Sequence, residues 1–130
     1  MEIPADVEKV EFATSIAWVD KDGILCSISK KVPAPSIEES KKELELFKKH
    51  FGDKKHCMLL DITNSAPTSK EARDWGAIEL AKLIKALAMI SNSALGKMVA
   101  NLFFGLKPPP YPTKMFTNEK EAKEWLKQYL

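Results

Sequence analysis

Three hydroxyl side chains, Ser65, Thr68 and Ser69, lie between an apolar run and a stretch with helical spacing. A phosphate on a hydroxyl at a helix N-terminus is stabilised by free backbone N–H groups and by the helix dipole. Lys70 and Arg73 follow closely, and their positive charges can offset those that a phosphate adds. Ser69, Thr68 and Ser65 are therefore candidate phosphoacceptors.

The same hydroxyl groups have a simpler interpretation as helix caps. Thr68, with Glu71 three residues later, matches the capping-box pattern, in which each side chain satisfies a free backbone N–H at the helix start. The pattern recurs at Ser36 and at Asn118. Because it occurs at three expected helix starts, capping alone also explains Thr68.

Polar residues follow the short apolar run 57–62, which ends near Asp61. In open α/β sheets, ligands collect at the carboxyl ends of the strands, so a binding loop is expected here. The alternative is that Asp61 only accepts backbone N–H groups of the loop that follows it. The candidate binding loop consists of Asp61, Thr63, Asn64, Lys70 and Arg73.

Other reactive residue types do not form a recognisable catalytic or metal pattern. His50, His56 and Cys57 lie close in sequence, but zinc sites usually repeat such a ligand pair and no second pair occurs. Cys57 lies within the apolar run, where burial makes a thiol inert. The sequence has no Gly-x-Ser-x-Gly, P-loop or Gly-x-Gly-x-x-Gly motif. We therefore predict no metal site, no cofactor and no catalytic residue.

The clearest amphipathic pattern runs over residues 95–106, with apolar residues at i, i+3, i+4, i+7, i+8 and i+11. Phe104 lies off this stripe, about a hundred degrees round the helix from its neighbour. Phe104 and Tyr111, with the prolines at 108–110, can form an apolar interface for a second subunit or a partner peptide. Alternatively, Phe104, Tyr111 and these prolines can line a pocket for an apolar ligand.

Periodicity and turn signals predict where these residues are placed. Asp20-Lys21-Asp22-Gly23 between the first two strands indicates a hairpin. Each later strand follows a helix, so those strands are expected to be parallel, with right-handed crossovers. The predicted fold is a small α/β sheet of about five strands, with an N-terminal hairpin and four helices. The expected strands cover residues 10–19, 24–28, 57–62, 86–90 and 113–116, and the expected helices cover 36–51, 68–83, 94–106 and 118–129.

Length and charge exclude several classes of protein. The 130 residues are expected to form one domain, 1–130, with a loose N-terminal segment at 1–9. Twenty Lys and Arg against eighteen Asp and Glu give a net charge of +2, so neither nucleic acid nor a membrane surface is an expected partner. The longest apolar stretches are far short of the roughly 20 residues of a membrane span. The acidic N-terminus is not a signal peptide, so we expect a cytoplasmic protein with reduced cysteines.

Several short motifs, in this order and spacing, carry a family resemblance. They are Trp18 before Asp22-Gly23-Ile24, then 58–62 (MLLDI), 69–73 (SKEAR), 111–117 (YPTKMFT), Glu121-Ala122 and Trp125-Leu126. From about residue 10 onward the chain resembles the STAS domain, the SpoIIAA-like fold of bacterial anti-sigma-factor antagonists. More closely, it looks like small stand-alone bacterial proteins described as STAS/SEC14-like, most of which have no assigned activity.

The resemblance implies one site in particular. Antagonists of this kind take a phosphate on a serine at the start of the helix after the central strand, within an Asp-Ser-Ser-Gly-like motif. The corresponding residues here, 66–71, lack the glycine, and a one-residue shift brings Ser69 to the acceptor position.

Three hypotheses for the function follow. The first is a non-enzymatic regulatory or scaffold protein that binds a protein partner and forms a homodimer. The second is a carrier of a small apolar ligand or lipid, which predicts an enclosed cavity between the sheet and the helices that hold Trp75 and Phe103. An enzyme is the third and least favoured.

Overall fold

The structure is a computed structural model that describes residues 1–94 and 109–130. Its centre is a sheet in which the spatial order of the strands is the same as their order along the chain. The first two pairings are antiparallel and the remaining three are parallel, as the sequence predicts for the later strands. The strands are β1 (Val10–Glu11), β2 (Ser15–Val19), β3 (Leu25–Ser29), β4 (His56–Asp61), β5 (Ile84–Ile90) and β6 (Thr113–Phe116).

The predicted hairpin is confirmed, but the sheet has one strand more than expected. Asp20 Oδ1 accepts hydrogen bonds from the backbone N–H groups of Asp22 and Ile24, both at 2.9 Å, and Gly23 has a φ of +86° that favours glycine. The single strand predicted over 10–19 is wrong. The chain bends after Glu11, where the Phe12 N–H donates to the Ser15 carbonyl, so β1 folds back and pairs with β2.

Three helices lie within the described residues: α1 (Ile37–Phe51), α2 (Lys70–Ala81) and α4 (Glu119–Lys127). Helix α1 begins with the predicted capping box, because Ser36 and Glu39 each accept the other's backbone N–H at 3.1 Å. It ends at Gly52, whose φ is +79° and whose N–H donates to the Lys48 carbonyl. The fourth expected helix, over residues 94–106, falls almost wholly outside the described residues.

The cap of α2 differs from the expectation by one residue. Ser69, not Thr68, is the N-cap, and its Oγ accepts the N–H of Ala72 at 3.2 Å. Thr68 lies before the cap, and Arg73 Nη1 donates to its carbonyl at 2.8 Å. The cap of α4 is the predicted Asn118, which accepts the N–H of Glu121.

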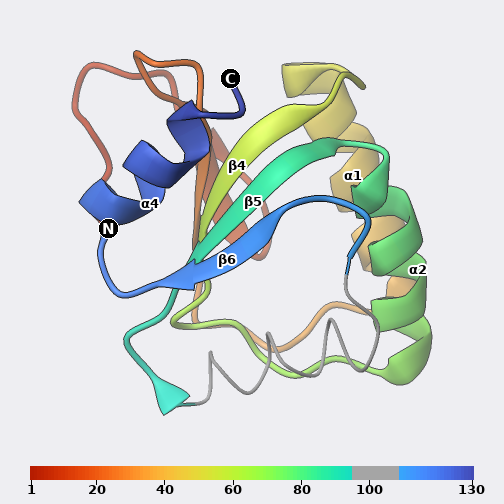
Figure 1. The fold of residues 1–130 in the computed structure, drawn as a ribbon. Coiled ribbons are helices and arrows are strands. Elements are labelled where there is room, and N and C mark those ends of the chain that lie inside the picture. The colour runs from red at the N-terminus through yellow and green to blue at the C-terminus, as the bar shows by residue number, and fades with distance from the viewer. Residues whose placement is uncertain (95–108) are drawn as a thin grey trace.

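The helices cover the two faces of the sheet unequally. Helices α1 and α2 lie together over one face, and α4 covers the other (Figure 1). Beneath α4 the core is closely packed around Trp18, Leu59 and Leu126, all of which are completely buried. Met1, Ile3 and Val7 of the segment that we expected to be loose contact this same core. Among the described helices, none combines the length and the apolar character that a membrane span requires.

Candidate functional site

A cavity of about 420 Å³ lies between the sheet and the pair α1 and α2. Leu44 and Phe47 from α1 and Trp75 and Leu80 from α2 form its walls, and cavity-facing side chains of β2 to β5 form its floor. This volume falls within the range of small-molecule sites, about 300–1,000 Å³. Most of the lining is apolar, so the cavity is suited to an apolar guest.

Small side chains account for the hollow. Ala17 and Ser27 pair across β2 and β3 in the floor, and Ala72 and Gly76 of α2 also line the cavity. Four such residues leave space that larger side chains would fill. As a result no residue of α1 is fully buried, whereas α4, on the opposite face, buries Leu126 completely.

The floor changes from polar to apolar along the strands. The register places Ser15 beside Ser29 at the carboxyl ends of β3 and β4. The next cavity-facing row contains Ala17, Ser27, Leu60 and Met89. The third row, at the far end, contains the apolar residues Leu25, Met58 and Leu87, and Tyr111 packs against it. The floor of the cavity therefore has a polar end and an apolar end.

Charged side chains at the polar end are already paired. Glu43 Oε1 accepts hydrogen bonds from the hydroxyl of Thr14 at 2.7 Å and from its backbone N–H at 3.1 Å. Lys30 Nζ lies 2.7 Å from Glu11 Oε2, and hydrogen bonding to Lys30 lowers the pKa of the Glu11 carboxyl. These contacts hold the charges at the rim of the cavity.

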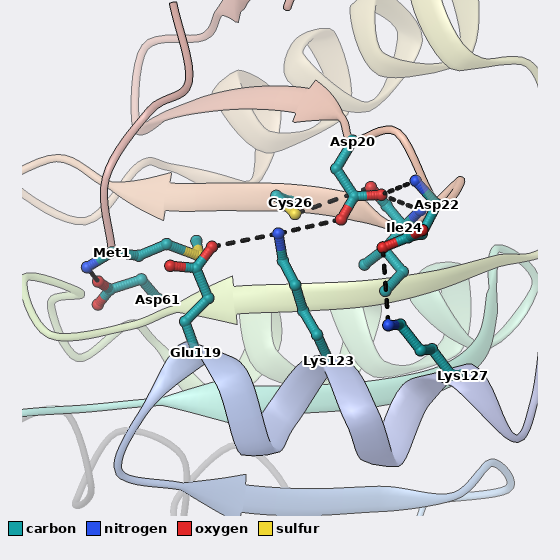
Figure 2. Close-up of polar contacts among 9 residues, drawn as sticks. All are labelled: Met1, Asp20, Asp22, Ile24, Cys26, Asp61, Glu119, Lys123 and Lys127. Atoms are coloured by element: carbon teal, nitrogen blue, oxygen red, sulfur yellow. Dashed lines mark hydrogen bonds and ion pairs between the residues drawn. The ribbon is translucent and has the colours of Figure 1, made fainter.

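Asp61 lies at the carboxyl end of β4 and is buried. Its Oδ1 accepts the N–H of Thr63 at 3.0 Å, which is the loop-stabilising contact considered above. Its Oδ2 lies 3.2 Å from the amino group of Met1 (Figure 2). Both oxygens therefore have structural partners.

The loops at this end are tied to each other. Thr63 Oγ1 accepts the N–H of Asn92 at 3.1 Å, and the Asn64 N–H donates to Ser29 Oγ at 3.2 Å. Asp61, Thr63 and Asn64 are thus held together at this end of the sheet, and a binding role for them stays a prediction.

The candidate phosphoacceptors divide into two groups. Ser65 and Thr68 are half-buried and line the polar end of the cavity. Ser69 is exposed and its oxygen caps α2. Lys70 is exposed and pairs with Asp74 at 2.8 Å, and it does not line the cavity. Phosphorylation of these residues stays a prediction.

Of the two predicted interface residues, only Tyr111 can be placed. It is buried, it lines the cavity, and burial raises the pKa of its hydroxyl. Phe104 lies outside the described residues. The cavity wall contains Trp75, whereas Phe103 falls outside the described range, and the cavity is partly open to solvent instead of enclosed as the carrier hypothesis predicts.

The remaining reactive groups do not converge. His56 is buried, its Nε2 lies 3.1 Å from the Phe51 carbonyl, and burial lowers its pKa. Cys26 and Cys57 are free and buried, and burial raises the pKa of both thiols, that of Cys26 to about 12. Within residues 1–94 and 109–130, no three His, Cys, Asp or Glu side chains gather in a way that could hold a metal ion.

A polar cluster on the α4 face was not predicted from the sequence. Lys123 reaches from α4 to Asp20 Oδ2 at 3.0 Å and also to Glu119 Oε1 at 3.2 Å (Figure 2). Burial of the ammonium lowers the pKa of Lys123, but bonding to Asp20 and Glu119 outweighs this and the net effect raises it. Glu119 and Lys123 are four residues apart, which predicts an ion pair on the surface of a helix. The neighbouring sequence gives no sign that Asp20 also contacts Lys123.

Ser27 and Ala17 were also missed as site residues. The only sequence signal is that Ser27 interrupts the apolar run 24–28. Its meaning depends on the register between β2 and β3, which places Ser27 beside Ala17 beneath the two helices.

The sheet, its strand order and the helices on both faces define a SpoIIAA-like α/β protein. A solved structure from Shewanella loihica PV-4, an uncharacterized protein of the DUF3478 family with a SpoIIAA-like fold, superimposes with a TM-score of 0.54. The two chains are 22% identical, and the match covers 97% of this chain and 98% of the other. This likeness shows the fold and confirms the resemblance drawn from the sequence.

Residues 17–130 match the family model described as "Domain of unknown function (DUF7793)", and the chain belongs to that family. A protein of unknown function from Arthrobacter sp. FB24 is 26% identical over 85% of this chain and 96% of its own, with a TM-score of 0.30. No curated protein matches the chain.

Proposed function

We propose that this protein is a non-enzymatic binding domain that holds a small apolar molecule in the cavity between the sheet and helices α1 and α2. The observation that carries the proposal is the combination of a volume of about 420 Å³ with a largely apolar lining. Apolar surface in contact with water is unfavourable by roughly 25 cal/mol per Å². A guest that displaces water from Leu44, Phe47 and Trp75 gains this free energy.

The contrast between the two faces supports the proposal. The same sheet is closely packed on its α4 side, where Trp18 and Leu126 are completely buried. On the α1 and α2 side, the apolar residues Leu44 and Phe47 stay only partly buried although they face the sheet. Within the described residues the cavity side is thus less closely packed than the α4 side, which leaves room for a ligand.

The proposal is tested by ligand recovery and by filling the cavity. Native mass spectrometry of the protein isolated from its own cells is expected to show an added mass that organic solvent extracts. Recombinant protein is expected to bind a neutral apolar dye such as Nile red. Ala17→Leu, which puts a larger side chain into the floor, is expected to abolish dye binding.

Ala13→Leu is the matched control. Ala13 is exposed and lies outside the cavity lining, so this variant is expected to bind the dye like the wild type. Circular dichroism checks that both variants fold. No dye binding by folded wild-type protein, together with no added mass, would refute the proposal.

A second candidate is regulation through protein–protein contact, with a homodimer in the cytoplasm. What supports it is the SpoIIAA-like fold together with the exposure of the α2 start, where Ser69 and Lys70 face solvent. Light scattering of the purified protein tests the homodimer. Phosphopeptide mapping tests Ser65, Thr68 and Ser69, and the absence of both a dimer and a phosphate would count against this candidate.

A further inference from the structure

We propose that the ligand is amphipathic, with an uncharged head group that forms hydrogen bonds to Ser27 and Ser15 at the polar end of the cavity. This inference rests on the proposed binding function. It adds the orientation of the ligand and the chemical class of its head group.

Orientation follows from the register of the floor. The row with Ser15 and Ser29 lies at the carboxyl ends of β3 and β4, and the row with Leu25, Met58 and Leu87 lies at the opposite end. The row with Leu25, Met58 and Leu87 offers an apolar chain only apolar floor side chains, whereas the row with Ser15 and Ser29 offers hydroxyl groups to a polar head. The head therefore lies toward Ser15 and the chain toward Met58.

The hydroxyl groups in the floor are available to a ligand. Ser27 and Ser15 face the cavity, and neither hydroxyl forms a hydrogen bond within residues 1–94 and 109–130. Ser29 already accepts the Asn64 N–H and keeps only its own hydrogen to donate. A serine hydroxyl both donates and accepts, so it matches an alcohol, an ester carbonyl or an amide.

The charged residues of the lining argue against an ionic head. Within the described lining the charged side chains are Lys30, Glu43, Asp61 and Glu79. The first three have the partners given above, and Glu79 pairs with Lys82 at 3.3 Å. A carboxylate head would thus be desolvated without an available cation, and an ammonium head would meet Glu43, whose Oε1 already accepts two hydrogen bonds from Thr14.

A matched series of eight-carbon probes tests the inference. Octane, octanol, octanoate and octylammonium share one chain and differ in the head, and each can be assayed by displacement of Nile red at pH 7.5. Octanol is expected to bind about threefold to tenfold more tightly than octane, the value of one hydrogen bond. Octanoate and octylammonium are expected to bind at least tenfold more weakly than octanol.

The double variant Ser15→Ala, Ser27→Ala is expected to remove the advantage of octanol and to leave octane affinity unchanged. Ser27→Thr keeps the hydroxyl on a β-branched residue that suits a strand, so it is expected to retain the preference for octanol. An ionic probe that binds as tightly as octanol would overturn the inference, and so would a preference for octanol that survives in the double variant Ser15→Ala, Ser27→Ala. If octane still binds in either case, the proposal of an apolar binding cavity is retained and only the head-group inference is rejected. If none of the four probes binds, the proposal of an apolar binding cavity is itself refuted.

Discussion

The carboxylate of Asp20, in the turn between β2 and β3, lies 3.0 Å from the ammonium group of Lys123 on α4. The side chain of Asp20 is only 6% exposed and that of Lys123 is 23% exposed. Asp20 Oδ1 meanwhile holds the turn by accepting two backbone N–H groups. One residue therefore shapes the hairpin and fixes the last helix to it.

This pair is expected to contribute measurably to stability. A double-mutant cycle with Asp20→Asn and Lys123→Met should give a coupling free energy of about 1–2 kcal/mol in urea unfolding. The control is the cycle with Asp22→Asn and Lys127→Met, because that pair is 4.0 Å apart and more exposed, at 35% and 54%. The control should give about 0–0.5 kcal/mol. Equal couplings in the two cycles would contradict the prediction.

His56 is expected to make the protein less stable in mild acid. Burial lowers its pKa in the folded state below the ordinary value of 6.5, so the unfolded state binds the proton more readily. Stability is then present above about pH 6.5 and is lost as the pH falls below it. Urea unfolding between pH 5 and 7.5 measures this loss. His56→Gln should reduce the dependence, and the variant of exposed His50, His50→Gln, should keep it.

The start of α2 gives a direct test of which residue caps it. Ser69→Ala removes the oxygen that accepts the Ala72 N–H, so it is expected to lower the free energy of unfolding by about 1 kcal/mol. Thr68→Ala is expected to cost less, because the contact of Thr68 with Arg73 uses its backbone carbonyl. Thermal or urea unfolding compares the two variants. A larger loss for Thr68→Ala would place the cap at Thr68.

Both cysteines are expected to be unreactive in the folded protein. Burial raises the pKa of Cys26 to about 12 and also raises that of Cys57, so the reactive thiolate is scarce at pH 8. Iodoacetamide should modify neither thiol in native buffer and both in urea, as read by mass spectrometry. Because the pKa of Cys26 is higher folded than unfolded, its contribution to stability is lost as the pH rises from about 9 toward 12. Rapid labelling of Cys26 in native buffer would contradict its burial.

Local signals predicted much of the fold. The Asp-Gly turn that ends at Gly23, the capping box at Ser36 and the stop at Gly52 depend on residues a few positions apart, and all three are present in the structure. The apolar run that became β4 correctly indicated a buried strand with a parallel neighbour. For the turn, the capping box and the helix stop, local chemistry was sufficient because the interacting residues are close in sequence.

Features that depend on distant partners were not predicted. Whether 10–19 forms one strand or two depends on the pairing of Val10 with Ala17, which a β-type composition does not reveal. The choice between Thr68 and its neighbour Ser69 as the cap was also missed, because both residue types suit an N-cap. Most of the candidate site also depends on distant partners. Ala17 and Ser27 form part of a cavity floor only because β2 pairs with β3 in this register and because helices pack above them.

The agreement between strand order and chain order has a consequence for how the protein assembles. Each strand after the first pairs with the strand that precedes it in the chain, so no earlier pairing has to reopen to admit a later strand. During synthesis the sheet is expected to grow from β1 toward β6, with each new strand meeting an edge that is already formed. The face of the sheet that contains Trp18 and Leu59, however, is covered by α4, which follows all six strands in the chain. Until α4 docks, the nascent protein therefore exposes this apolar face, which is where we expect chaperones to act first.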